Sequence, residues 1–250
     1  MKILQNMLPV AKLYDALKYI APYKKGMLES RAAGDFEKER EYILKSTSTW
    51  GNHLLKIFDI KLNVTGKENL PQSGPVVFVA NHQGYADIPI CCTTLDKFQF
   101  GFVAKNDLGK IPLYGNWIKS LRSVMIERDD ARASLRAIEE GIDLIEKGFS
   151  LVIFPEGTRS SGGPMKQFKK GSLRLATKSG VPLIPVTING SWRAFEETGV
   201  IRKGTPVDIV IHPVIETKNM NRNDANNLSG QVEEIIKNQL ELLAQKNNHV

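Results

Sequence analysis

The chain has 250 residues, 42% of them hydrophobic, which is enough to bury the core of one α/β domain or of one domain with an appendage. Its 34 Lys and Arg outnumber its 27 Asp and Glu, and the net charge of +7 favours acidic partners such as anionic membranes or phosphorylated metabolites. The excess charge is spread along the chain, without a basic stripe interleaved with aromatics, and this argues against nucleic-acid binding.

The sequence gives no indication of a cofactor or a metal. Cys91 and Cys92 are adjacent, a spacing that seldom forms a disulfide and cannot build a zinc site alone, so we expect a reduced compartment and no structural metal. Nucleotide binding is unsupported because neither a Walker A sequence nor G-x-G-x-x-G is present. No apolar run approaches about 18 residues and the N-terminus lacks a signal-peptide core, so the protein is expected in the cytosol or lying on a membrane.

Residues 1–60 are predicted to form a segment of two amphipathic helices, the second over about 36–58. One face of the first helix is apolar and flanked by lysines, and it is made by Ile3, Met7, Val10, Tyr14 and Leu17. Such a helix is typical of a segment that lies in the interface of an anionic membrane. The alternative is that the apolar stripe packs on the core or on the second helix.

Residues 61–250 are predicted to form an α/β domain. Short strand-like segments alternate with amphipathic helical ones, the last of which covers about 228–243. The expected strands are 61–66, 75–80, 97–104, 123–127, 150–154, 182–188 and 207–215. This alternation predicts a mostly parallel central sheet with helices on both faces.

Polar side chains follow four of the expected strands directly. They are His82, Lys105, Arg128 and the turn Glu156–Arg159. Ligands of parallel α/β sheets collect beyond the carboxyl ends of the strands. We therefore expect these four features to converge on one crevice.

The stretch "NHQGYADIP", residues 81–89, contains a histidine and an aspartate five residues apart. Neither a helix nor a strand would bring the two side chains together, so the chain must turn between them if they meet. His82 paired with Asp87 would form a general base whose tautomer is fixed by a carboxylate. No G-x-S-x-G nucleophile is present, which indicates that the nucleophile is a hydroxyl of the substrate. A pair that merely holds a loop is the alternative.

The stretch "FPEGTRSSGG", residues 154–163, is predicted to be a tight turn after a strand. Glu156, Gly157 and Thr158 offer a carboxylate, exposed amides and a hydroxyl. Arg159 adds a planar guanidinium, which binds phosphate bidentately. An ordinary turn is the alternative for the glycines, and Lys105 and Arg128 taken singly could be surface charges.

These two stretches resemble the signatures of the glycerolipid acyltransferase family, the His-x₄-Asp box and the "FPEGTRS" block. The resemblance continues in family order through the segments "VTGKENLPQSGPVVFVANH", "AKNDLGKIPLYGNW", "VMIERDD" and "VPLIPVTING". It covers roughly residues 61–192, and the two signatures at this spacing are highly specific.

The resemblance implies direct acyl transfer from an acyl thioester to the 2-hydroxyl of lysophosphatidic acid, giving phosphatidic acid. His82 is then the base and Asp87 its orienting partner. The phosphate is held by Arg159 and Lys105, and by Arg128 as a further candidate. Glu156, Gly157 and Thr158 belong to the same pocket.

The resemblance implies no cofactor and leaves the donor open between acyl-carrier protein and acyl-CoA. It places the enzyme on the cytoplasmic face of the cell membrane without a spanning helix. Another lysolipid acceptor, a phospholipid-binding module and a hydrolase that activates water through His82 remain as alternatives.

Overall fold

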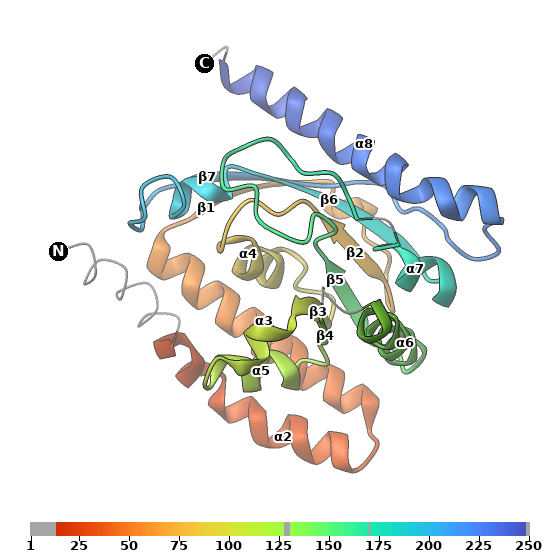
Figure 1. Cartoon of the computed structure of the whole chain (residues 1–250). Coiled ribbons are helices and arrows are strands. Elements are labelled where there is room, and N and C mark those ends of the chain that lie inside the picture. Colours follow the sequence, from red (N-terminus) through yellow and green to blue (C-terminus); the bar gives the residue numbers. More distant parts are fainter. Residues whose placement is uncertain (1–13, 128–130, 170, 249–250) are drawn as a thin grey trace. The chain divides into compact units, whose positions relative to one another are not determined.

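The computed structural model describes residues 14–127, 131–169 and 171–248. Seven strands alternate with helices along most of the chain (Figure 1). The strands are β1 (Lys61–Thr65), β2 (Val77–Ala80), β3 (Phe100–Lys105), β4 (Val124–Ile126), β5 (Ser150–Ile153), β6 (Leu183–Asn189) and β7 (Pro206–Ile211). The helices are α2 (Ala21–Ala32), α3 (Phe36–Phe58), α4 (Asp87–Thr94), α5 (Tyr114–Ser120), α6 (Ala131–Glu146), α7 (Arg174–Ser179) and α8 (Arg222–Asn248). Shorter 3₁₀ turns are η1 (Leu17–Ile20), η2 (Lys67–Asn69), η3 (Asn106–Lys110) and η4 (Ser191–Ala194).

The strands form one sheet in the order β1-β7-β6-β2-β5-β3-β4. β2 pairs with β6 in parallel, β3 pairs in parallel with β4 and with β5, and β1 pairs in parallel with β7. β6 and β7 are antiparallel. The expected α/β fold with a mostly parallel sheet is therefore confirmed, with one antiparallel pair that the alternation of strands and helices did not predict.

The chain divides into two compact units. The first comprises the described part of Met1–Ile57 with Ser73–Pro75 and Ile88–Val152. Its helices are joined by aromatic and ionic contacts, since the Trp50 and Trp117 rings lie 4.5 Å apart and Trp117 donates to Ser46 Oγ at 3.0 Å. The fully buried Glu39 receives Arg31 at 2.7 Å and Arg122 at 2.8 and 2.9 Å. A buried charge needs such partners, so this triad fixes α2 and α3 within the unit.

The predicted apolar face of the first N-terminal helix is described only in part. Its first three residues lie outside the described residues, while Tyr14 and Leu17 are half-buried. Ala16 and Ile20 are buried, and the Tyr19 ring lies 3.8 Å from the ring of His53 on α3. Tyr19 therefore contacts the second helix, whereas the choice between membrane docking and packing for the predicted apolar face stays open. Of the helices in the described ranges, none has both the length and the apolar character needed to cross a bilayer.

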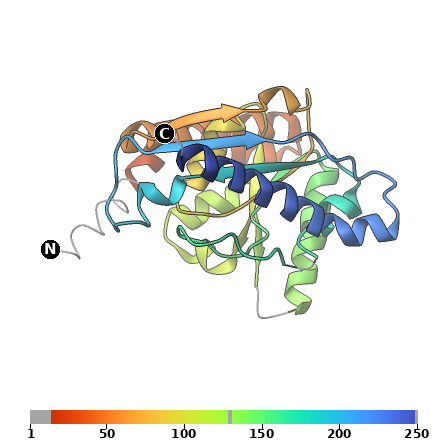
Figure 2. The ribbon, with the colours of Figure 1, turned by 90° about the horizontal axis from the view of Figure 1, so that it is seen from above.

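The second unit comprises Phe58–Gln72, Val76–Asp87 and Ile153–Val250. It contains β1, β7, β6 and β2, and α8 lies over β6 (Figure 1 and Figure 2). The buried face of α8 is made by Leu228, Val232 and Ile236, which follow helical spacing. β2 and β6 are buried over almost their whole length, as expected for strands covered on both faces.

The seven expected strands are present, with shorter bounds at several ends. β7 stops at Ile211 because Pro213 cannot donate to a ladder, and Ile215 only bridges to Leu183. α8 begins earlier than the predicted helix, at Arg222. Helix α5 was not predicted, and it is only seven residues long.

Candidate active site

The turn that follows β2 is fixed at its start by Asn81. Its side-chain Nδ2 donates to the carbonyl of Ile188 at 2.8 Å, and its Oδ1 accepts the Ile188 amide at 2.8 Å. The buried amide thus continues the pairing of β2 with β6 by one residue after the strand itself ends. This places the next residue, His82, at the carboxyl end of β2, as the sequence predicted.

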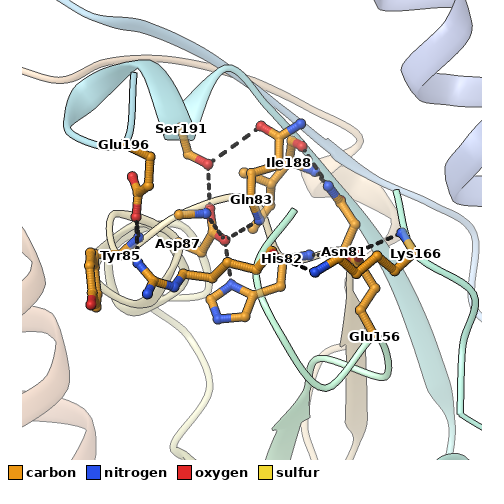
Figure 3. Close-up of polar contacts among 12 residues, drawn as sticks. Asn81, His82, Gln83, Tyr85, Asp87, Glu156, Lys166, Ile188, Ser191 and Glu196 are labelled. Atoms are coloured by element: carbon orange, nitrogen blue, oxygen red, sulfur yellow. Dashed lines mark hydrogen bonds and ion pairs between the residues drawn. The ribbon is translucent and has the colours of Figure 1, made fainter. Parts of the chain in front are cut away.

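His82 and Asp87 meet although they are five residues apart. The chain turns between them, and His82 Nδ1 lies 2.6 Å from Asp87 Oδ2 (Figure 3). The same oxygen accepts the amides of Gln83 at 2.7 Å and Gly84 at 2.9 Å, and Oδ1 accepts the hydroxyl of Ser191. Asp87 is fully buried at the start of α4, so these donors stand in for water around its charge.

The hydrogen bonds of Asp87 determine the tautomer of the imidazole. Two backbone amides already donate to Oδ2, so His82 Nδ1 must carry the proton that bonds to this oxygen. Nε2 makes no hydrogen bond within the described residues and is left as the acceptor. The ring of Phe154 stacks on the imidazole at 4.3 Å and 26° and fixes its plane. Because its side chain is 18% exposed, His82 can be reached by a substrate.

Glu156 joins the two signature segments through backbone amides. Its Oε1 accepts the amide of His82 at 2.6 Å and its Oε2 accepts that of Lys166 at 2.8 Å. Burial raises the pKa of this carboxyl, whereas the two amides act in the opposite direction. Ser160 then donates from its amide to the carbonyl of His82 at 2.8 Å, and Ser161 to that of Gln83 at 3.0 Å. The turn 154–163 and the turn after β2 are therefore one hydrogen-bonded assembly.

The glycine of the "FPEGTRS" block allows this turn to form. Gly157 has φ of 72°, a left-handed conformation that side chains disfavour, and a Cβ there would lie 2.8 Å from Lys169 Cε. Thr158, which follows it, is exposed to solvent. Gly157 and Thr158 lie in the turn after β5, at the position predicted from the sequence.

Arg159 is held on two sides. Its Nη1 donates to Glu196 Oε1 at 2.8 Å, and its Cζ lies 3.5 Å from the centroid of the Tyr85 ring. Lys166 Nζ also donates to the Arg159 carbonyl at 3.0 Å. Because the side chain is 31% exposed, the guanidinium can be reached from solvent.

The structure does not test whether the other two predicted basic residues, Lys105 and Arg128, lie at this site. Lys105 is the last residue of β3 in the first unit, where its Nζ lies 2.5 Å from Asp107 Oδ2. Hydrogen bonds from Lys105 and Lys110 lower the pKa of Asp107. Arg128 lies outside the described residues. That Lys105 and Arg128 lie in one crevice with His82 and the turn 156–159 therefore stays a prediction.

Several residues of the site were missed by sequence reasoning. Ser191 and Glu196 follow β6, and Phe154 follows β5 directly. The rule of carboxyl strand ends, applied to β6, would have pointed to Ser191, because β6 runs parallel to β2. In the ranges that the structure describes, no group of three or more His, Cys, Asp or Glu could hold a metal ion.

The sequence model of the acyltransferase family matches residues 61–189. The chloroplastic 1-acyl-sn-glycerol-3-phosphate acyltransferase LPAT1 of Arabidopsis thaliana is 37% identical over 159 residues, which cover 62% of this chain and 44% of that protein. The 1-acyl-sn-glycerol-3-phosphate acyltransferase of Borreliella burgdorferi is 31% identical over 184 residues, covering 74% of this chain and 73% of that one.

A solved structure has the same fold. It is that of the 1-acyl-sn-glycerophosphate (LPA) acyltransferase PlsC from Thermotoga maritima, with a TM-score of 0.77, 32% identity and coverage of 98% of both chains. The match with the chloroplastic relative spans less than half of that protein, whereas the match with the bacterial structure spans nearly all of both chains. With its fold, its His–Asp pair and these matches, the chain belongs to the acyltransferase family.

Proposed function

We propose that the protein is a 1-acylglycerol-3-phosphate acyltransferase, which transfers a fatty acyl group from a thioester to the 2-hydroxyl of lysophosphatidic acid and yields phosphatidic acid. One observation carries the catalytic part of this proposal. His82 Nδ1 is bonded at 2.6 Å to a fully buried carboxylate, which leaves Nε2 as a proton acceptor. The substrate in the names of the related proteins supports the choice of acceptor.

The reaction needs one base and no covalent enzyme intermediate. His82 Nε2 takes the proton of the 2-hydroxyl while its oxygen attacks the thioester carbonyl. Asp87 stabilises the imidazolium that forms, because its charge lies against Nδ1. The carbon–sulfur bond then breaks, and the leaving thiolate receives the proton from Nε2. A base in this position accelerates such a step about 10²- to 10⁴-fold.

The phosphate of the acceptor is assigned to Arg159, the charged end of the turn after β5. Nη1 is used by Glu196, and the opposite edge with Nε and Nη2 can form a bidentate pair with a phosphate. Gly157 and Thr158 contribute the backbone and hydroxyl of the same turn, while Glu156 holds that turn to His82. Lys105 and Arg128 remain candidates for further phosphate contacts.

The acyl donor is a thioester of acyl-carrier protein or of coenzyme A. Both donors are acidic, in keeping with the net charge of +7. The reaction as derived requires neither a cofactor nor a metal, since the base and the phosphate ligand are side chains.

Residues 1–60 are proposed to dock the enzyme on the cytoplasmic face of an anionic membrane, with residues 61–250 as the acyltransferase domain. The substrate and the product are both lipids, so the enzyme must reach a bilayer. The lysines that flank the apolar face of residues 1–17 each contribute about 1 kcal/mol near an anionic surface. The membrane attachment is therefore peripheral in this proposal.

The test is an assay of the purified protein with lysophosphatidic acid and acyl-CoA, in which phosphatidic acid and released thiol are measured together. Equal amounts of both products are expected. Thiol without phosphatidic acid would indicate a hydrolase, and neither product, with acyl-CoA or with acyl-carrier protein, would indicate a lipid-binding module. Replacing lysophosphatidic acid by other lysolipids shows whether another acceptor is preferred.

A further inference from the structure

The loop after β6 brings a second carboxylate, Glu196, to the site. Its side chain is only 6% exposed, and its Oε1 accepts both Arg159 Nη1 and the amide of Tyr85, each at 2.8 Å (Figure 3). The proposed acyl transfer does not use the Glu196 carboxylate. Its burial nevertheless costs free energy, and burial raises the pKa of Glu196.

The other oxygen of Glu196 is packed tightly rather than solvated. Oε2 is buried and finds no hydrogen-bond partner in the described part of the chain. A Cβ built on Gly84 would lie 2.5 Å from this oxygen, closer than real Cβ contacts. The glycine inside the His-x₄-Asp segment therefore provides the space in which the carboxylate lies.

These contacts restrict the guanidinium of Arg159. One nitrogen is tied to Glu196, and one face lies 3.5 Å from the centre of the Tyr85 ring. Tyr85 is in turn fixed through its own amide to the same carboxylate oxygen. A long arginine side chain in this arrangement keeps one edge, Nε and Nη2, for a ligand and loses little further entropy when it binds.

We propose that Glu196 is a positioning residue for Arg159, and that Gly84 is required because it makes room for Glu196. The inference rests on the proposed function, in which Arg159 binds the phosphate of the acceptor. Glu196 touches neither the hydroxyl nor the thioester in this scheme. Its loss is therefore expected to weaken acceptor binding through Arg159 rather than to slow the chemical step.

The experiment measures binding of a short-chain, monomeric lysophosphatidic acid without donor, together with kcat and KM for transfer. Glu196→Ala is expected to weaken binding and raise KM about 10- to 100-fold, the effect of a lost hydrogen bond to a charged group. Glu196→Gln keeps an acceptor for Arg159 and Tyr85 and should recover most of that loss. In all these variants kcat should change less than about threefold.

The matched control is Glu197→Ala in the same loop. Glu197 Oε2 pairs with Arg202 Nη1 at 2.8 Å and has no contact with Arg159 among the described ion pairs. This variant loses a more exposed Glu–Arg ion pair in the same loop and should bind like the wild type. A comparable loss in both variants would contradict the proposal and assign the effect to disorder of the loop.

Two further comparisons separate positioning from a structural role. In an Arg159→Ala background, Glu196→Ala should weaken binding no further, because the partner that it positions is absent. Gly84→Ala keeps the Glu196 carboxylate but fills the space in which it lies. It should reproduce the binding defect of Glu196→Ala, and the double variant should bind no more weakly than Glu196→Ala alone. Additive effects in either cycle would overturn the proposal.

The outcomes also distinguish this inference from the proposed function. If the wild type binds the lysolipid but transfers no acyl group, the proposed function fails while the binding cycles still decide the role of Glu196. If the wild type transfers normally and Glu196→Ala has unchanged KM and binding, the positioning role is wrong and the proposed function stands.

Discussion

Ser191 donates its hydroxyl to Oδ1 of Asp87, the carboxylate oxygen that His82 does not use. The two residues are distant in sequence, and they meet because β6 runs parallel to β2 and ends beside it. Gly190, with φ of 98°, turns the chain so that Ser191 points back to the carboxylate. The base therefore depends on three segments, the turn after β2, the start of α4 and the turn after β6.

Ser191→Ala should lower kcat about tenfold and leave KM for lysophosphatidic acid nearly unchanged, because it removes a hydrogen bond to a charge that orients the base. Steady-state kinetics with both substrates measures this. Ser46→Ala is the control, since it also removes a buried hydroxyl bonded to a side chain, that of Trp117. Unchanged kcat in Ser191→Ala would show that Asp87 is held sufficiently by the backbone amides.

Arg159→Ala should weaken the use of phosphate-bearing acceptors selectively. Loss of a charge-assisted bidentate contact is expected to reduce kcat/KM for lysophosphatidic acid by about 10²-fold or more. The deficit should be much smaller for a monoacylglycerol, which the wild type should already use poorly. An equal loss on both acceptors would mean that the role of Arg159 is structural.

The stability of the fold should fall as the pH decreases through 6.5, and His212 should account for part of this. Burial lowers the pKa of His212 from its ordinary value of 6.5, and its Nε2 lies 2.8 Å from Thr187 Oγ1. Below pH 6.5 the unfolded chain takes up a proton that the folded chain resists, so the free energy of unfolding decreases there.

His212→Gln removes this group, and its curve of unfolding free energy against pH should be flatter than that of the wild type between pH 8 and 5.5. Urea unfolding at several pH values measures the difference. Burial raises the pKa values of Glu156 and Glu196, and their effect on stability is opposite to that of His212. Their contribution to the free energy of unfolding decreases as the pH rises from 4.5 through their folded pKa values. Both glutamates are present in the wild type and in His212→Gln, so their effect cancels in the comparison. Parallel curves of unfolding free energy against pH for the two proteins would contradict the assignment to His212.

Removal of residues 1–13 should leave a folded protein that no longer sediments with anionic vesicles. The buried positions Ala16 and Ile20 make this a better boundary than a longer deletion, because a cut after them would remove part of the packed core. Activity should fall far more on bilayer-held acceptor than on a short-chain, monomeric one. Sedimentation equal to that of the intact chain would mean that docking lies elsewhere.

The mostly parallel sheet could be predicted because its strands are short apolar segments separated by helical ones. α5 could not, since seven residues carry too little periodicity and the helix follows Leu113, whose φ of 59° is unusual for a leucine. Trp117 of this helix packs on Trp50 of α3, and such tertiary contacts supply most of the stability of a helix this short.

In the site, residues within the two signature segments could be predicted because their spacing and their place after strands carry the signal. The Glu156 carboxylate was expected to shape the phosphate pocket, which stays a prediction, and in the structure it accepts two backbone amides. Glu196 carries no local signal in the sequence, because its partners Arg159 and Tyr85 belong to two other segments of the chain. Their contacts form only in the folded chain, and the same holds for the short distance between Gly84 and the Glu196 carboxylate on which the proposal for Gly84 rests.

In the proposed reaction, His82 is the general base of acyl transfer. The most direct measurement is the rate of phosphatidic acid formation by His82→Ala, compared with the wild type at saturating acceptor and donor. A loss of about 10²- to 10⁴-fold is expected, with binding of lysophosphatidic acid largely retained. A variant that keeps more than about a tenth of the wild-type rate would contradict it, since a base worth 10²-fold or more could not then be His82.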